Sequence, residues 1–179
     1  MFHISSLLKN SILTATVCFA ATSAMAQSTE KPTDPQIADI AYTAGQIDVT
    51  AANLALEKTK NRAVRSFAEE MARDHEAVNK QVLTLLDKLK VEPEDNDTSK
   101  SLVDAASKKQ AELLQLSGAA FDKAYAENEV AYHQTVNTAL ENTLIPDAQN
   151  GQLKQLLETG LKLFQEHQKH AEHLVHELK

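Results

Sequence analysis

Apolar residues between Arg62 and Lys90 recur with the spacing of an amphipathic helix. One series has members seven residues apart: Val64, Met71, Val78 and Leu85. A second series runs three or four residues out of phase with the first, and two such interleaved series predict one buried face of an α-helix. His75 occupies a position in the second series, so its imidazole is predicted to point into the protein.

The same kind of pattern predicts four long helices and one short helix. The long helices are expected at residues 34–58, 62–90, 119–144 and from about 152 to the C-terminus, and the short helix at 101–116. Asp34 and Asn61 are predicted to cap the first two helices, and Pro146 marks the last turn. Few glycines and many Ala, Leu, Lys, Glu and Gln residues favour an all-α domain. The predicted fold is an up-and-down four-helix bundle with the extra short helix in the crossover.

Each of the other long helices also carries ionisable residues within or beside its apolar stripe. At 100° per residue, Asp48 falls within about 20° of Ile37 on the first helix. Glu129 lies inside the stripe of the 119–144 helix, and His133 lies on the edge of that stripe. His167 lies about 40° from the centre of the last stripe. Acids and imidazoles therefore occupy places where aliphatic residues would be expected.

One or two inward residues from each long helix form a candidate metal site: Asp48, His75, Glu129, His133 and His167. Carboxylate and imidazole ligands that project inward from facing helices suit iron, manganese, zinc or copper. When residues are counted from the predicted turns, Asp48 and His75 lie at the same depth in the bundle to within about 4.5 Å. By the same count, Glu129 lies closer than His133 to the depth of His167. The alternative is a metal-free core in which these groups pair with one another and fix the helix register.

The first 26 residues have the features of a signal peptide. Lys9 precedes an apolar run at 12–21, and Ala24-Met25-Ala26 offers small residues at the cleavage positions. Cleavage at this point would remove Cys18, the one cysteine, and leave a flexible polar lead at 27–33 and a single helical domain at 34–179. The sequence thus predicts an exported, periplasmic protein that is stabilised by helix packing rather than by disulfides.

Charge and missing motifs exclude several classes of function. The chain has 18 basic and 25 acidic residues and a net charge of −7, which argues against nucleic-acid binding. No segment after the signal peptide approaches the roughly 20 apolar residues of a membrane span. The sequence lacks a Gly-rich phosphate loop, a nucleophile elbow, a cysteine pair and the Glu-x-x-His spacing of di-iron bundles. Whether the protein is an enzyme stays open, and His170, His173 and His176 are expected to turn toward solvent.

Several of these residues resemble the motifs of a known family. The matching segments are Met71-x-x-Asp74-His75, Phe121-Asp122-x-x-Tyr125, Val130-x-x-His133 and the late histidine His167. They are similar to a family of exported bacterial proteins that is catalogued as a domain of unknown function, often labelled as outer membrane proteins and considered ferritin-like. The resemblance implies a ferritin-like bundle in the periplasm or at the outer membrane. Asp48 matches the acid in the family's first helix, whereas Lys162 stands where members often carry proline.

Two hypotheses of function follow from the sequence. The first is an exported ferritin-like bundle that binds a transition metal, either iron, manganese, zinc or copper, inside its core. The second is a non-catalytic envelope-stress or protein-interaction module whose inner polar residues are metal-free and only set packing. The sequence leaves self-association open and indicates no particular partner protein.

Overall fold

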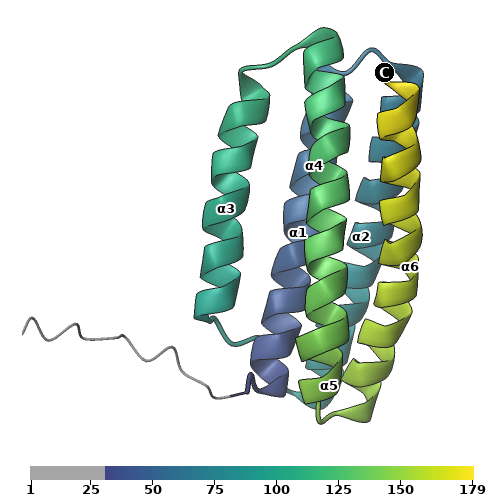
Figure 1. Cartoon of the computed structure of the whole chain (residues 1–179). Helices are drawn as coiled ribbons and strands as arrows, with labels where there is room; N and C mark the ends of the chain where they lie inside the picture. The colour runs from purple at the N-terminus through teal and green to yellow at the C-terminus, as the bar shows by residue number, and fades with distance from the viewer. Residues whose placement is uncertain (1–30) are drawn as a thin grey trace, which may run out of the picture. The chain divides into compact units, whose positions relative to one another are not determined.

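A computed structural model describes residues 31–179 as an all-α protein (Figure 1). Its helices are α1 (Asp34–Lys58), α2 (Arg62–Leu89), α3 (Asp97–Leu114), α4 (Gly118–Ala139), the π-helical segment η1 (Leu140–Leu144), α5 (Ile145–Asp147) and α6 (Gly151–Glu177). This part of the chain contains no strand. The predicted signal peptide and most of the predicted lead lie outside the described residues.

The four long helices α1, α2, α4 and α6 form one bundle, and α3 stands beside α1 and α4 (Figure 1). Short connections join α1 to α2 and α5 to α6, so the members of each pair run antiparallel. The predicted all-α bundle of four long helices and one extra short helix is confirmed. Within residues 31–179, none of the helices has both the length and the apolar character that a membrane span needs.

Side-chain caps explain where three of the four long helices begin: α1, α2 and α6. Asn61 accepts hydrogen bonds from the first turn of α2, and Asn150 does the same for α6. The predicted cap of α1 is wrong by one residue, because Thr33 and Gln36 form a reciprocal capping box there. The Asp34 carboxylate instead accepts bonds from backbone N–H groups that precede α6, at 2.8 Å each. Asp34 therefore connects the start of the chain to the last turn.

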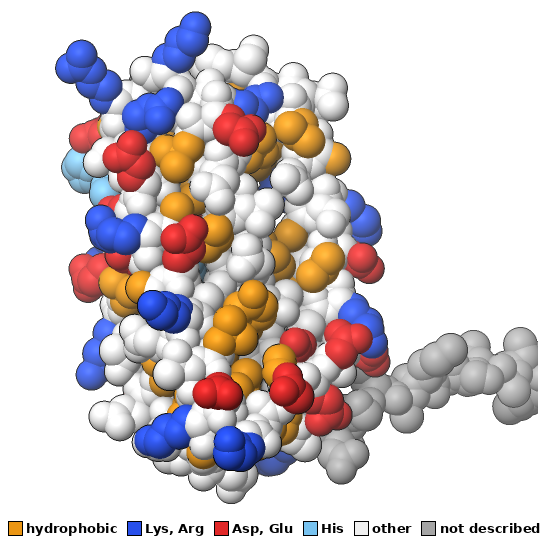
Figure 2. Space-filling model, turned by 180° about the vertical axis from the view of Figure 1, so that it is seen from behind, with side chains coloured by type: hydrophobic (Ala, Val, Ile, Leu, Met, Phe, Trp, Pro, Cys, Tyr) orange, Lys and Arg blue, Asp and Glu red, His pale blue; other side chains and the backbone are white. Residues whose placement is uncertain are grey.

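Helix α3 is packed less tightly than its pattern predicted. It begins at Asp97 rather than Ser101, because Asn96 caps it and accepts a hydrogen bond from the Ser99 backbone. Two of its apolar side chains, Val103 and Leu114, are 47% and 50% exposed. On the face seen from behind, hydrophobic side chains are exposed among the charged ones along the whole length of the described part of the molecule (Figure 2).

The interior consists of two apolar layers with a polar layer between them. One apolar layer lies around Phe67 and the other around Phe164. Because Asp48 and His75 are buried and lie at intermediate positions of α1 and α2, they fall between these layers. Gly45 allows α1 to approach α2 closely, since a methyl group there would overlap the Asn79 side chain. The bundle thus places polar side chains midway along its length.

Candidate metal centre

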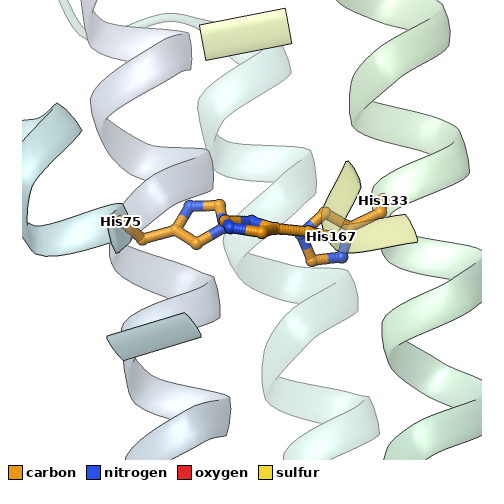
Figure 3. A group of neighbouring side chains, drawn as sticks. All are labelled: His75, His133 and His167. Atoms are coloured by element: carbon orange, nitrogen blue, oxygen red, sulfur yellow. The ribbon is translucent and has the colours of Figure 1, made fainter. Parts of the chain in front are cut away.

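Four long helices bring five ionisable side chains into the polar layer. Asp48 comes from α1, His75 from α2, Glu129 and His133 from α4, and His167 from α6. All five are buried, with at most 3% of each residue exposed. The imidazoles of His75, His133 and His167 converge between the helices (Figure 3), and one ring nitrogen from each lies within 4.8 Å of the others. The five predicted site residues therefore lie together in the structure.

Three of the polar atoms form a nearly equilateral triangle. The Nε2 atoms of His75 and His133 are 3.4 Å apart, and Asp48 Oδ2 lies 3.5 Å from the first and 3.6 Å from the second. A point equidistant from three such atoms is about 2.0 Å from each, which matches the bond lengths of about 2.0–2.2 Å that zinc makes with nitrogen and oxygen. The triangle therefore has the size of one face of a small metal coordination sphere.

His133 and His167 each make a hydrogen bond through one ring nitrogen, and this bond determines which nitrogen carries the lone pair that could bind a metal. His133 Nδ1 lies 3.0 Å from the Glu129 carbonyl oxygen and donates to it, which leaves Nε2 as an acceptor facing Asp48. His167 Nε2 lies 3.2 Å from Asp74 Oδ2, and its Nδ1 has no hydrogen-bond partner among residues 31–179. Metal-bound histidines characteristically donate their second N–H to a carbonyl or carboxylate in this way. Both rings thus have the arrangement of ligands.

Aromatic contacts hold the third ring in place. The Phe164 ring stacks on His75 with centroids 4.5 Å apart and an interplanar angle of 7°. The His133 and His167 rings are edge-on to each other at 5.5 Å. Phe164 also lies near both of those rings, so one side chain packs against all three imidazoles. The site is consequently closed by an apolar wall on one side.

The two carboxyl groups lie deep in the bundle without sufficient hydrogen bonds. The two carboxyl groups lie within hydrogen-bond reach of each other. No other group in the described part of the chain donates a hydrogen bond to either Asp48 oxygen or to Glu129 Oε2. Burial raises the pKa of Asp48 to about 7. Burial first and the nearby Asp48 charge second raise the pKa of Glu129 well above its usual range. A cation in the layer would stabilise both carboxylates in their charged form.

The histidines are shifted in the opposite direction. Burial lowers the pKa of His133 to about 4, and burial together with the neighbouring imidazoles lowers the pKa of His75 well below its usual value. Burial also lowers the pKa of His167, although Asp74 opposes this effect. At neutral pH all three rings are therefore neutral, which is the protonation state that binds a metal.

The turn before α6 lies later than predicted. The chain stays helical past Pro146 to Asp147, so the turn is centred about three residues further along the chain. The ring centroid of His133, which was expected to lie further than Glu129 from the level of His167, is 5.5 Å from that of His167. The later turn moves the whole of α4 relative to α6.

The sequence reasoning missed three groups that support the site. Asp74 positions His167, and its signal is the sequence Asp74-His75, which places an acid at the edge of the inward stripe. Tyr125 is fully buried and Tyr132 donates to the Ala44 carbonyl oxygen at 2.8 Å. The Glu129 and Asp48 charges, after burial, raise the pKa of both phenols. As predicted, the histidines late in α6 are exposed: His170, His173 and His176.

Comparison with solved structures supports the helical fold. A crystal structure from Streptomyces coelicolor described as a "putative secreted protein DUF305" is similar, with a TM-score of 0.70 and 14% sequence identity. The similarity covers 81% of this chain and 93% of that one. At this identity the likeness concerns the fold alone.

Sequence comparison identifies the family. No curated protein matches the chain. The family model for the domain of unknown function DUF4142 matches residues 19–174 and so includes all five residues of the polar layer. The chain therefore belongs to the DUF4142 family.

Proposed function

We propose that this protein is an exported, ferritin-like bundle that binds one first-row transition-metal ion in its polar layer. The observation that carries the proposal is the triangle formed by His75 Nε2, His133 Nε2 and Asp48 Oδ2, with edges of 3.4, 3.5 and 3.6 Å. His167 is the fourth ligand in this proposal, and Glu129 balances the charge of the ion. The predicted signal peptide supports a periplasmic location, whereas association with the outer membrane rests on family resemblance alone.

The donor set supports a choice among the four candidate metals. Imidazole nitrogen with a single carboxylate suits zinc, copper and iron, whereas manganese takes mainly oxygen ligands. A tetrahedral ion with bonds of about 2.1 Å requires edges of about 3.4 Å, and an octahedral ion requires about 3.0 Å. The three edges of the triangle are close to the tetrahedral value, and the His167 nitrogen lies within 4.8 Å of those of His75 and His133, so His167 would move inward to bind as the fourth ligand. Zinc and copper therefore fit better than iron, and iron fits better than manganese.

The burial of the ligands supports retention of the ion over chemistry at the ion. Four protein ligands complete a four-coordinate sphere and leave no open position for a substrate. Each of the four proposed ligands is at most 3% exposed. We therefore propose a binding or storage role and do not assign an enzymatic reaction.

A metal-free polar core, as in an envelope-stress or interaction module, is supported less well. Buried polar groups in such a core pair with one another. Here His167 Nδ1 has no hydrogen-bond partner within the described chain, and three carboxyl oxygens of Asp48 and Glu129 have none other than the neighbouring carboxyl group. An ion would supply the missing partner for several of these groups at once.

Metal titration of the untagged mature protein after chelator treatment tests the proposal. We expect one zinc or copper ion per chain in calorimetry and a higher melting temperature, because an ion that binds only the folded state stabilises it. Asp48→Ala and His75→Ala should lose binding, and the exposed His173→Ala should retain it. If iron, zinc, copper and manganese all leave the melting temperature unchanged and none is bound, the proposal is wrong.

A further inference from the structure

A second group of carboxylates and imidazoles lies between α2 and α6, beside the polar layer. Glu70 and Asp74 stand one turn apart on α2, and His167 and His170 stand one turn apart on α6; we call these four residues the outer cluster. One oxygen from each carboxylate and one ring nitrogen of His167 all lie within 4.8 Å of one another. His170 Nδ1 lies 2.7 Å from Glu70 Oε2. Carboxylates and imidazoles on facing helices suit a first-row transition-metal ion.

The outer cluster is in contact with solvent, whereas the polar layer is not. The side chains of Glu70 and His170 are 32% and 45% exposed, and that of Asp74 is 18% exposed. The ligands proposed above for the polar layer, which we call the inner centre, are each at most 3% exposed. An ion in solution therefore reaches the outer cluster directly, but it needs a path to the inner centre.

Neighbouring side chains hold the outer cluster in place despite its exposure. The His170 ring lies edge-on to the buried Phe67 ring, with centroids 5.1 Å apart. Arg73 Nε donates a hydrogen bond to Asp74 Oδ1 at 2.7 Å, so that Oδ2 is the oxygen that faces His167. The Arg73 side chain is 68% exposed, and water screens its charge. The outer cluster thus presents ordered ligand atoms to an approaching cation.

His167 belongs to both sites and connects them. Its Nε2 lies 3.2 Å from Asp74 Oδ2 in the outer cluster, while its buried Nδ1 has no hydrogen-bond partner among residues 31–179. A neutral imidazole has one proton and one lone pair on its two nitrogens. The ring can therefore offer Nε2 to the outer cluster or Nδ1 to the inner centre, but not both at once. An ion bound tightly at one site excludes full coordination at the other, which is consistent with one tightly bound ion per chain.

We propose that the outer cluster is a loading site, which takes a transition-metal ion from solution and passes it to the inner centre through His167. During the transfer the ring proton leaves Nδ1 and Nε2 gains a proton, which it donates to Asp74 Oδ2; no oxidation state changes. The loading role rests on the proposed inner centre, whereas ion binding at the outer cluster does not.

Stopped-flow uptake of Co²⁺ by the chelator-treated mature chain tests the loading role, because tetrahedral Co²⁺ absorbs visible light more strongly than the hydrated ion. Glu70→Gln should load the inner centre at least about tenfold more slowly, because loss of a ligand weakens capture of the ion. Release to a chelator should slow by the same factor, since a loading site changes the path and not the final state. His170→Ala should behave alike. Glu69→Gln, at an exposed neighbouring position of α2, is the matched control and should load normally.

Zinc titration of His75→Ala tests the outer cluster by itself, because this variant lacks the tight inner centre. At zinc concentrations well above those that fill the inner centre of the unmodified protein, we expect one weakly bound ion per chain. Adding Glu70→Gln to this variant should weaken that binding at least about tenfold, and adding Glu69→Gln should not change it.

The two measurements separate this proposal from the proposed function. No zinc bound by His75→Ala would overturn the outer site. Normal cobalt loading by both Glu70→Gln and His170→Ala would overturn the loading role and leave the inner centre intact. Failure of the unmodified protein to bind cobalt or zinc tightly would overturn the inner centre and with it the loading role, while the titration of His75→Ala would still decide whether the outer cluster binds an ion.

Discussion

The two apolar layers and the polar layer between them are held together differently. In one apolar layer Phe67 packs on Tyr125 with ring centroids 6.1 Å apart, and both residues are completely buried. In the polar layer, Asp48 is equally buried, but no N–H group in the described chain donates a hydrogen bond to its oxygens. Apolar contacts stabilise the fold, whereas a buried carboxyl group with too few hydrogen bonds costs stability. The contrast shows that the apolar layers maintain the bundle, and it supports the proposal that the polar layer binds a metal.

The largest expected effect concerns an apolar layer alone. Phe67→Ala should lower the free energy of unfolding by about 3–5 kcal/mol, because it removes a buried ring and leaves a cavity. Chemical denaturation of the metal-free protein measures this loss. The folded fraction should bind the same number of metal ions per chain as the unmodified protein. Phe67→Leu is a milder substitution that leaves more of the protein folded, so the same measurement can be made on it. Loss of metal by folded Phe67→Leu would show that packing in the apolar layer and metal binding in the polar layer are coupled.

The next effect concerns the approach of α1 to α2. Gly45→Ala should cost about 1–3 kcal/mol, because the added methyl group overlaps Asn79 and separates Asp48 from His75. Both thermal stability and metal affinity should therefore fall. Gly160→Ala is the matched control, since its methyl group would make ordinary contact with Phe164 at 3.5 Å. That variant should be neutral or slightly stabilising, because alanine favours a helix more than glycine does. Equal effects at the two glycines would contradict the role of close packing.

The third effect concerns Asp74, which contacts His167 at the edge of the polar layer. Asp74→Asn should weaken metal binding about 10- to 100-fold, because the Asp74 carboxylate orients His167 and strengthens it as a ligand. Competition with a metal chelator of known affinity measures the change. Asp87→Asn, at an exposed position on the same helix, should have no effect. If Asp74→Asn binds metal normally, His167 does not need its partner.

The smallest effect is the pH dependence of the metal-free protein. The raised pKa values of Asp48 and Glu129 mean that the folded state keeps protons which the unfolded chain has released near neutrality. The free energy of unfolding should therefore fall as pH rises above about 6.5. The contribution of Asp48 ends once the pH passes its folded-state pKa of about 7, and Glu129, whose pKa is raised further, continues the fall at up to about 1.4 kcal/mol per pH unit. In this pH range the buried histidines are neutral in both the folded and the unfolded state. They lower the free energy of unfolding only on acidification, so their effect is confined to lower pH.

Denaturation at pH 6.5, 7.5 and 8.5 in chelator measures this slope. Glu129→Gln should make it shallower, because the amide does not titrate. Saturating zinc should also reduce it, since the metal keeps the Asp48 carboxylate charged. Stability that rises across this range in the metal-free protein would contradict the assignment.

Periodicity was sufficient to predict which residues turn inward. Asp48, His75 and His167 each fall within an apolar stripe, and all three are buried. The cap Asn61 was predicted from local chemistry, because an amide side chain can accept hydrogen bonds from the N–H groups of the next turn. Burial and helix ends therefore depend on short-range information that the sequence carries directly.

Relative depth between helices was harder to predict, because it depends on turns. The chain stays helical through Pro146, so the turn comes about three residues later than predicted, and the His133 ring lies beside the His167 ring. Asp74 was missed as a supporting group because its contact with His167 joins residues 93 positions apart. The exposed side chains of α3, such as Val103, show that an apolar pattern does not ensure close packing.

The five inward residues are spread from position 48 to position 167, so the centre is complete only after the last helix has docked. A chain that is truncated before His167 lacks part of the proposed coordination sphere. If the proposed site binds metal, the metal content of a preparation would therefore report the fraction of molecules in which all four long helices are docked.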